Sequence, residues 1–449
     1  MKFLFLSVLL TGFAFAGNND LTHRPKSFST RAGKAVFVDF TEANYTINYD
    51  IAGESASAVA DITLSVVEEG FIVFDSVEDP TSIKLDGKTV SATLQKTPNN
   101  ETTVRVLDTL ASAGTHKLSV TVPLKELVEF TSGGVKSAFW TSDLDERNFL
   151  ERYLPASFEY DQVKMNFTVN FQGGKAEQII YTNGMVKEKS KTNFSISYPK
   201  HFTVSSVFFH TVPKGETNEV RGSFRSIDGR DIPVVVYNKA SSWTGTAGLE
   251  RLKNKAELVF RELEGDYGAW PHAQLIIYNA GMGGMEYCGA TMTDTGAVGH
   301  EMFHSYFARG MMPANGNSGW LDEALASWRD NGYPRSSSLS GSSGMSSHPY
   351  YTRITDQAAY SFGARFMAYL DGKLAEKGGL KSFMRHVTDK RIFAPLFVEE
   401  FSQELSAFSG IDVGGDFKKY TYGNKSSAVE KSENPVHRKM SLAELRKHL

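Results

Sequence analysis

Hydrophobic and polar residues alternate along the first half of the chain, from about residue 34 to 210. The clearest stretch, VKMNFTVNF, has apolar residues at Val163, Met165, Phe167, Val169 and Phe171. The segment ASAVADITLSV shows the same period of two, with Ala58, Ala60, Ile62, Leu64 and Val66 on one face. This alternation predicts half-buried strands. Asp86-Gly87 predicts a hairpin turn, and Pro123 is expected to end another strand. Together they predict an antiparallel β-sandwich.

The second half of the chain has the period of a helix. Its first helical segment, TAGLERLKNKAELVFRELEG, carries apolar residues at Leu249, Leu252, Ala256, Val259, Phe260 and Leu263. Gly265 is expected to end this helix. A buried strand is predicted in AQLIIYNAG, a second helix in WLDEALASWRD, and a third helix from near Tyr360. This half is therefore predicted to be a mixed, helix-rich domain.

These patterns divide the chain into four parts. Residues 1–16 are expected to be a signal peptide, 17–215 the β-sandwich, 216–423 a second, helix-rich domain, and 424–449 a polar C-terminal tail. Within the tail, Ser441 and Glu444 have the spacing of a helix capping box. The fold class that results is α+β with several domains.

The first residues, MKFLFLSVLLTGFAFAGNND, have the pattern of a cleaved secretory signal. Lys2 is followed by a short apolar run and then by the small residues Ala14 and Ala16, so cleavage is expected after Ala16. The run is too short to span a bilayer, which takes about 20 apolar residues. The mature protein is therefore expected to be secreted or periplasmic, with no membrane insertion after signal removal.

The composition and charge of the chain argue against some classes of function and of metal site. The chain is 41% hydrophobic and 22% charged, with a formal net charge of -3, so nothing in its charge favours binding to nucleic acid or to an anionic membrane. Cys288 is the single cysteine. An internal disulfide and a zinc site made of cysteines are therefore both excluded.

The segment VGHEMFHSYFARG contains residues that can bind a metal ion. His300 and His304 are four residues apart, so on a helix they share one face and can bind one cation. Glu301 lies next to the first histidine, where its carboxylate can reach a water held by the metal. A catalytic zinc needs a third protein ligand. Glu323, 19 positions after His304 in a predicted helix, is the best candidate.

HExxH followed by glutamate in WLDEALASW resembles the gluzincin metallopeptidases of the aminopeptidase N and leukotriene hydrolase type. The segment GMGGMEYCG resembles the G-x-M-E-N segment of that family, with Tyr287 in place of the asparagine. The resemblance implies a β-sandwich followed by a thermolysin-like, helix-rich catalytic domain. It also implies one zinc ion per chain and peptide substrates.

The resemblance further implies roles for individual residues. It makes His300, His304 and Glu323 the zinc ligands and Glu301 the general base. Glu286 would bind the free α-amino group of the substrate, with Gly283, Gly284 and Met285 along the substrate-binding edge. Tyr360 would stabilise the oxyanion, with Tyr350 and Tyr351 as rivals for that role. Asp330 matches an acidic position of the family and would orient a ligand histidine.

Three functions are consistent with this sequence. The first is an exported zinc aminopeptidase, in which Glu286 anchors a free N-terminus. The second is a zinc endopeptidase on the same scaffold. The third is a non-catalytic binding protein with a vestigial site, which the intact set of ligands and base disfavours. Oligomeric state, the preferred side chain at the cleavage point and the physiological peptide stay open.

Overall fold

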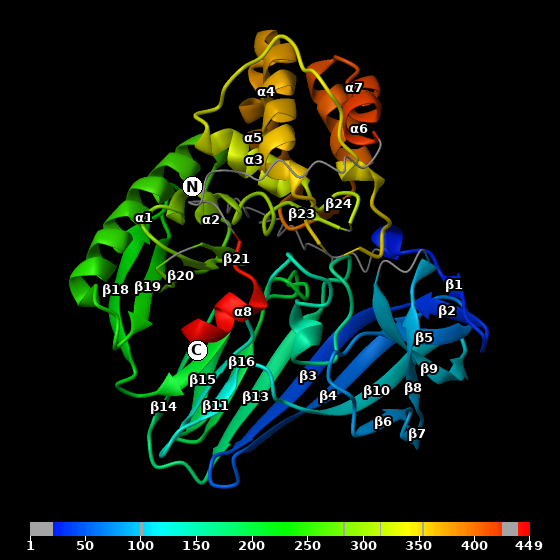
Figure 1. The fold of residues 1–449 in the computed structure, drawn as a ribbon, viewed down its shortest axis with the longest axis vertical. Helices are drawn as coiled ribbons and strands as arrows, with labels where there is room; N and C mark the ends of the chain where they lie inside the picture. Colours follow the sequence, from blue (N-terminus) through cyan, green and yellow to red (C-terminus); the bar gives the residue numbers. More distant parts are fainter. Residues whose placement is uncertain (1–20, 99–101, 282, 315, 353, 424–438) are drawn as a thin grey trace, which may run out of the picture.

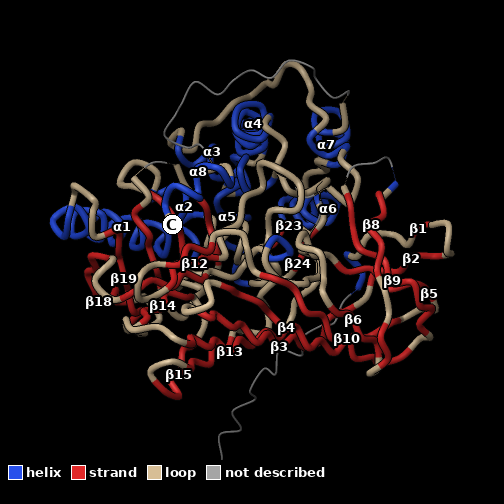
Figure 2. Tube along the Cα trace, turned by 60° about the horizontal axis from the view of Figure 1, so that its bottom comes forward, coloured by secondary structure: helices blue, strands red, loops and turns tan. Residues whose placement is uncertain are grey.

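The structure is a computed structural model that describes residues 21–98, 102–281, 283–314, 316–352, 354–423 and 439–449. Its strands and helices are segregated. The first half of the chain forms strands at one end of the molecule, and the helices of the second half gather at the other end (Figures 1 and 2). The predicted arrangement of a β-rich domain followed by a helix-rich domain is confirmed.

The β-rich domain contains three sheets. The large sheet has the order β15 (Met185–Ser190), β16 (Asn193–Ser197), β13 (Lys164–Gln172), β3 (Asp39–Asp50), β4 (Ser55–Val66), β10 (Gly114–Pro123), β6 (Ser82–Leu85) and β7 (Lys88–Thr89). The second has the order β1 (Phe28–Ser29), β2 (Lys34–Phe37), β5 (Gly70–Phe74), β9 (Thr103–Ala111) and β8 (Ala92–Lys96). The third has the order β11 (Val128–Phe130), β12 (Val135–Ala138), β17 (Phe209–Pro213) and β14 (Gln178–Thr182).

The alternating segments form the strands that the sequence predicts. The apolar residues of VKMNFTVNF in and beside β13, and the five predicted apolar positions of one face of β4, are all buried in one core. Asp86 and Gly87 both have positive φ, 51° and 79°, and join β6 to β7 as a hairpin, as expected for this dipeptide. Strand β10 ends at Pro123.

The sandwich is mostly antiparallel, but two of its strand pairs are parallel. Strand β3 pairs with β13 in parallel, from Glu42 opposite Lys164 to Asp50 opposite Gln172, and β2 pairs with β5 in the same way. Parallel neighbours need a long crossover between them, and the chain between β3 and β13 supplies one. A period of two does not distinguish the two pairings, so the sequence pattern could not reveal this difference.

The second domain is built on a five-stranded sheet and a set of helices. The sheet has the order β18 (Thr217–Arg225), β19 (Asp231–Lys239), β20 (Leu275–Asn279), β22 (Ala290–Thr293) and β21 (Met285–Tyr287). The helices are α1 (Gly245–Tyr267), α2 (Val298–Phe303), α3 (Leu321–Asp330), α4 (Ala364–Lys373), α5 (Gly379–Arg391), α6 (Val398–Ser409) and α7 (Gly414–Thr421). A small ladder joins β23 (Met312–Pro313) to β24 (Pro395–Leu396).

One helix boundary differs from the prediction, and a second helix begins where it was expected but with an irregular first turn. Helix α1 continues past Gly265 to Tyr267, and Gly268, with φ of 104°, follows its end. Leu263 and Tyr267 are both buried, so packing of the last turn outweighs the weak helix propensity of Gly265. The helix expected near Tyr360 begins as a π-helical turn, Ala359–Gly363, and becomes regular only in α4.

The middle strand of the five-stranded sheet, β20, is buried on both faces. Leu275 and Ile277 of β20 point into the core formed with the helices, whereas Ile276 and Tyr278 point into the core shared with the β-rich domain. Strand β21 is the last strand of this sheet. The border between the two domains therefore runs along β21.

The end of the chain also belongs to this border. Residues 439–449, which the sequence places in a polar tail, pack against the shared core through Met440, Leu442, Leu445 and Leu449. The short helix α8 (Leu442–Leu445) begins with the predicted capping box of Ser441 and Glu444. In Figure 1 this red segment lies between β21 and the strands of the β-rich domain.

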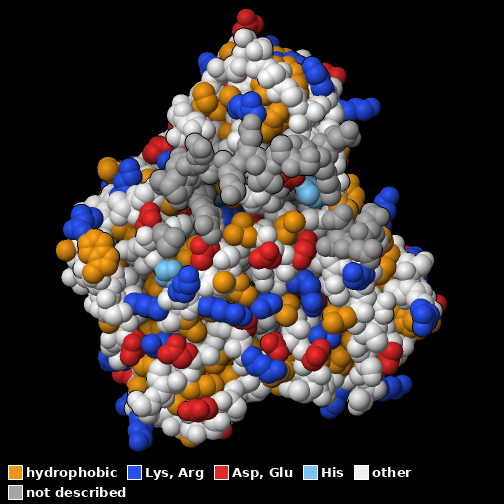
Figure 3. All heavy atoms as spheres, in the orientation of Figure 1, with side chains coloured by type: hydrophobic (Ala, Val, Ile, Leu, Met, Phe, Trp, Pro, Cys, Tyr) orange, Lys and Arg blue, Asp and Glu red, His pale blue; other side chains and the backbone are white. Residues whose placement is uncertain are grey.

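Two surface properties complete the picture. No helix in the described ranges is both long enough and apolar enough to cross a bilayer. Acidic and basic side chains are both spread over the face seen in Figure 3, in keeping with the small net charge of the chain.

Candidate active site

The two histidines of the HExxH segment lie on one face at the end of α2. The helix itself ends at Phe303, but His304 keeps helical geometry (φ -61°, ψ -18°), and its backbone N–H donates to the His300 carbonyl. The two imidazole rings are 4.8 Å apart between centroids. Both side chains are almost fully buried. The local chain geometry thus aims both rings at the same point.

Helix α3 brings Glu323 to the same point. Glu323 Oε2 lies 3.1 Å from His300 Nε2, and Oε1 lies 3.5 Å from His304 Nε2. The three side chains together form a buried group whose candidate ligand atoms all lie within 4.8 Å of one another. The spacing of 19 positions between His304 and Glu323 is therefore bridged by two packed helices, as the sequence suggests.

The outer nitrogen of each ring is held by an acceptor. His300 Nδ1 lies 2.6 Å from Asp330 Oδ2, and His304 Nδ1 lies 3.2 Å from the Phe307 carbonyl oxygen. Donation from Nδ1 leaves the Nε2 lone pair of each ring directed at Glu323. Within the described part of the chain, the buried His304 Nε2 makes no hydrogen bond. Two imidazole nitrogens and a carboxylate in this arrangement fit a zinc ion.

Charges around the group shift the pKa values of its members. Burial on its own would lower the pKa of His300, but hydrogen bonds to Asp330 and Glu323 raise it well above its usual value. Burial raises the pKa of Glu301 well above its usual range; His300 opposes the shift, and Glu286 and Glu323 add to it. The site thus holds several carboxylates close together in a dry environment.

Glu301 lies directly against the backbone of Gly284. A Cβ atom placed on Gly284 would come within 1.9 Å of Glu301 Oε1, so no other residue fits there without moving the carboxylate. Glu301 Oε2 is buried and has no hydrogen-bond partner among the described residues. Gly284 comes immediately before β21, and it therefore fixes the distance between Glu301 and the edge of the sheet.

Glu286 lies in the middle of β21 and is also buried. Its Oε1 atom lies 3.0 Å from Arg309 Nη2, and Arg309 also donates to Ser205 of the β-rich domain. Burial opposes ionisation of Glu286, but the cations Lys439 and Arg309 and the nearby His304 lower its pKa to about 2. Met285 turns its side chain into the shared core instead. Glu286 is thus an ionised carboxylate beside the candidate metal ligands.

Tyr360 is the tyrosine that faces this cluster. It lies in the π-helical turn that packs on α3, where Gly363 allows close contact with Ala324. Its hydroxyl is buried without a hydrogen-bond partner in the described ranges, and burial together with the charge of Glu323 raises its pKa well above the usual value. The hydroxyl of its rival Tyr351 donates to the Lys26 carbonyl, and Tyr350 packs on Phe397.

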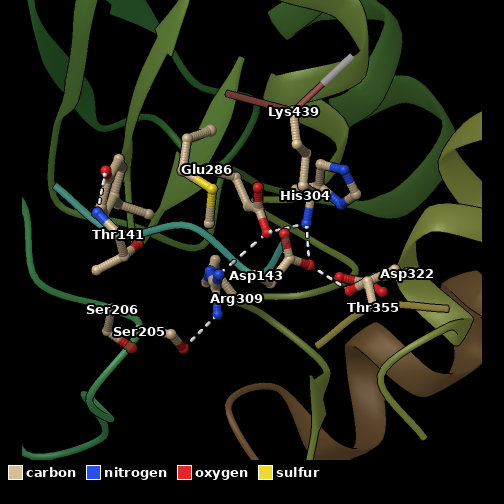
Figure 4. Close-up of polar contacts among 12 residues, drawn as sticks. Thr141, Asp143, Ser205, Ser206, Glu286, His304, Arg309, Asp322, Thr355 and Lys439 are labelled. Atoms are coloured by element: carbon tan, nitrogen blue, oxygen red, sulfur yellow. Dashed lines mark hydrogen bonds and ion pairs between the residues drawn. The ribbon is translucent and has the colours of Figure 1, made fainter. Parts of the chain in front are cut away.

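The structure adds residues that the sequence does not reveal. Figure 4 shows the ammonium of Lys439 between Glu286 and Asp143, beside His304. Lys439 Nζ lies 2.7 Å from Asp143 Oδ2 and 2.8 Å from Glu323 Oε1. Asp143 and Asp322 also line a pocket at the domain border next to Glu286 and Arg309. No sequence motif marks Lys439, Asp143 or Arg309, because these residues come from segments far apart in the chain.

Known structures share this fold. No protein-family model and no curated protein matches the sequence. The structure of aminopeptidase A from Legionella pneumophila in complex with aspartic acid matches with a TM-score of 0.63 at 15% identity, over 86% of this chain and 49% of that chain. The chain thus spans about half the length of that protein.

Two further structures match over a larger share of their own length. The M1 zinc metallopeptidase from Deinococcus radiodurans has a TM-score of 0.63 at 15% identity, over 88% of this chain and 96% of that one. Native yeast LTA4 hydrolase has a TM-score of 0.61 at 13% identity, over 88% of this chain and 69% of that one. The chain therefore has the two-domain fold of the aminopeptidase N and leukotriene hydrolase type of gluzincin.

Proposed function

We propose that the protein is a zinc-dependent peptidase that removes residues from the free N-termini of peptides. The observation that carries this proposal is the buried convergence of His300, His304 and Glu323 beside Glu301, whose Oε2 atom makes no hydrogen bond within the described ranges. The fold shared with zinc aminopeptidases supports it. Glu286, ionised and buried at the edge of the sheet, supports the preference for a free amino group.

The residues of the chain can then be assigned steps. His300, His304 and Glu323 would hold the zinc, which supplies Lewis-acid activation of the scissile carbonyl and of water. Glu301 would take the proton of the attacking water and pass it to the leaving amine. Tyr360 would donate a hydrogen bond to the oxygen on which negative charge develops. Glu286 would pair with the substrate ammonium and so fix the position of the first peptide bond.

Reporter peptides distinguish this function from its alternatives. The purified mature protein is incubated with aminoacyl amides that carry a chromogenic leaving group, and with the same compounds acetylated at nitrogen. Cleavage restricted to the free amines is the expected result. Cleavage of the acetylated compounds would identify an endopeptidase, and cleavage of neither by the zinc-loaded protein would identify a non-catalytic binding protein.

Asp330→Asn should weaken zinc binding by about 10- to 100-fold, because the neutral amide takes away the negative charge that strengthens the hydrogen bond to His300 Nδ1 and increases the basicity of the ring. The measurement is competition for zinc with a fluorescent chelator. Glu262→Gln is the matched control, since Glu262 is the other partner of the Arg329 that holds Asp330. Equal weakening by both variants would assign the effect to Arg329 and not to the histidine.

Gly284→Ala should reduce kcat/KM by about tenfold to a hundredfold, since the added methyl group must displace the Glu301 carboxylate and small displacements of catalytic groups are costly. Zinc content should stay unchanged. Gly265→Ala is the control, because a Cβ there, near the C-terminal end of α1, meets nothing within 4 Å. Full activity of Gly284→Ala would show that Glu301 does not need this position.

We also propose that the protein is exported and cleaved after Ala16, on the evidence of its first residues. The residues of this signal lie outside the described ranges. N-terminal sequencing of protein recovered from the periplasmic fraction and from the medium tests the proposal. A mature chain that still begins at Met1 in the cytoplasmic fraction would contradict it.

A further inference from the structure

Residues 439–449 lie beside the edge of the sheet that carries Glu286. The backbone of Lys439 forms a parallel β-bridge with Gly284, which lies next to β21 at the edge of the five-stranded sheet of the second domain. Extended peptides commonly bind proteins by adding a strand to such an edge. The following residues enter helix α8, which lies between the sheet and the β-rich domain (Figure 1). The C-terminal segment thus approaches the site as a ligand does, along the backbone beside Glu286.

The ammonium of Lys439 lies among the acidic groups that the proposed function uses. Its Nζ atom lies 2.8 Å from Glu323 Oε1 and 3.4 Å from Glu286 Oε1, and Asp143 completes the set at 2.7 Å. Lys439 is 3% exposed. A primary ammonium held by Glu286 has the charge and the hydrogen-bonding groups of a substrate N-terminus (Figure 4). Its contact with Glu323 places it against a candidate metal ligand as well.

The rest of the segment is anchored outside the cluster. The Met440 carbonyl accepts a hydrogen bond from Ser142, and the His448 carbonyl accepts one from Tyr278. Leu445 is fully buried in the shared core. Arg446 pairs with Glu126 of the β-rich domain at 2.6 Å. These contacts hold the segment at the domain border independently of the Lys439 side chain. They would therefore keep the lysine at a high effective concentration near Glu286 and Glu323.

From this placement we infer that residues 439–449 inhibit the active site of their own chain. The Lys439 ammonium occupies the position of the substrate amine at Glu286 and competes with the metal ion for Glu323. The full-length chain is then a latent form. Binding of zinc and of a free N-terminus requires that Lys439 leave the carboxylates. This inference rests on the proposed function, since it assigns Glu323 to the metal and Glu286 to the amine.

Two cations that compete for one carboxylate lower each other's affinity reciprocally. Removal of the lysine charge should therefore strengthen zinc binding, by about 5- to 150-fold if the coupling has the usual size. Loosening of the anchor should act in the same direction, because the lysine is then held less often at the cluster. Conversely, zinc should displace the Lys439 ammonium from the carboxylates and weaken the pairing of Lys439 with Gly284.

Zinc affinity of the full-length protein tests the inference. Chelator-stripped wild type, Lys439→Gln and Leu445→Ala are titrated with zinc against a fluorescent chelator. Lys447→Gln, in the same segment but exposed, is the matched control. Tighter binding by Lys439→Gln and Leu445→Ala, and wild-type binding by Lys447→Gln, is the expected result. Zinc binding of equal strength in all four proteins would overturn the inference while leaving the zinc site intact.

Hydrogen exchange of the wild type supplies a second readout that needs no variant. The peptide that covers residues 439–449 should exchange faster in the zinc-loaded protein than in the stripped protein. Equal protection in both states, with zinc bound stoichiometrically, would overturn the inference even if Lys439→Gln failed to fold. Absence of zinc binding in every protein, Lys439→Gln included, would instead refute the proposed function on which the inference rests.

Discussion

Glu301→Gln should lower kcat by about 10²- to 10⁴-fold, the usual contribution of a positioned general base. The amide keeps the size of the carboxylate and its place against Gly284, but it cannot accept the proton of the attacking water. KM should change little, because in the proposed mechanism Glu301 would contact the reacting water and not the bound peptide. Steady-state kinetics on a free aminoacyl amide, with zinc saturating, provide the measurement.

Zinc content separates this effect from a loss of metal. Glu301 is not one of the three residues whose ligand atoms converge, so elemental analysis of Glu301→Gln should still find zinc at the wild-type ratio. His304→Ala should lose both zinc and activity, since it removes a ligand. Near-normal turnover by zinc-loaded Glu301→Gln would remove Glu301 from the role of base and leave the water without a proton acceptor at this position.

Glu286→Gln should reduce kcat/KM for substrates with a free amino group by on the order of 100- to 1000-fold. Truncation of one partner in a buried charged pair costs about 2–5 kcal/mol, and here the substrate ammonium loses its partner. The cations Lys439 and Arg309 and the nearby His304 lower the pKa of Glu286 to about 2, so the substitution removes a negative charge from the site. Any residual cleavage of acetylated substrates should be unaffected.

Glu286→Gln also takes a carboxylate partner from Arg309, so a control must disturb Arg309 without changing Glu286. Glu159 is the other acidic partner of Arg309, 3.7 Å from its Nη1 atom, and belongs to the β-rich domain. Glu159→Gln therefore disturbs Arg309 while leaving β21 intact, and it should retain most of the activity. If Glu286→Gln and Glu159→Gln reduced activity equally, the effect would belong to Arg309 and the amine-binding role of Glu286 would be wrong.

Much of the candidate site could be predicted from the sequence because its parts are local. The spacing of His300 and His304 fixes their common face on any helix. Glu323 and Asp330 lie seven positions apart in one helical segment, and α3 brings Glu323 to the two rings and Asp330 to His300. The alternation in β4 and β13 likewise depends only on neighbouring residues.

The features that the sequence did not predict depend instead on tertiary packing. Gly265 was expected to end α1 on local propensity, but burial of the following turn continues the helix to Tyr267. The parallel pairing of β3 with β13 depends on where a strand more than a hundred positions away is added to the sheet. The capping box of Ser441 and Glu444 was expected from the sequence, whereas the packing of four apolar side chains around it depends on partners far away in the chain.

The sequence by itself determined the two kinds of domain, the pair of histidines with its glutamate, and the helix that carries the third ligand, because each of these follows from a period or a spacing within one segment. Only the tertiary structure decided that Lys439, Asp143 and Arg309 surround Glu286. Lys439 and Asp143 are 296 positions apart, and no local pattern encodes which distant charges will meet. Their meeting follows from the packing of both domains and the chain end around one border.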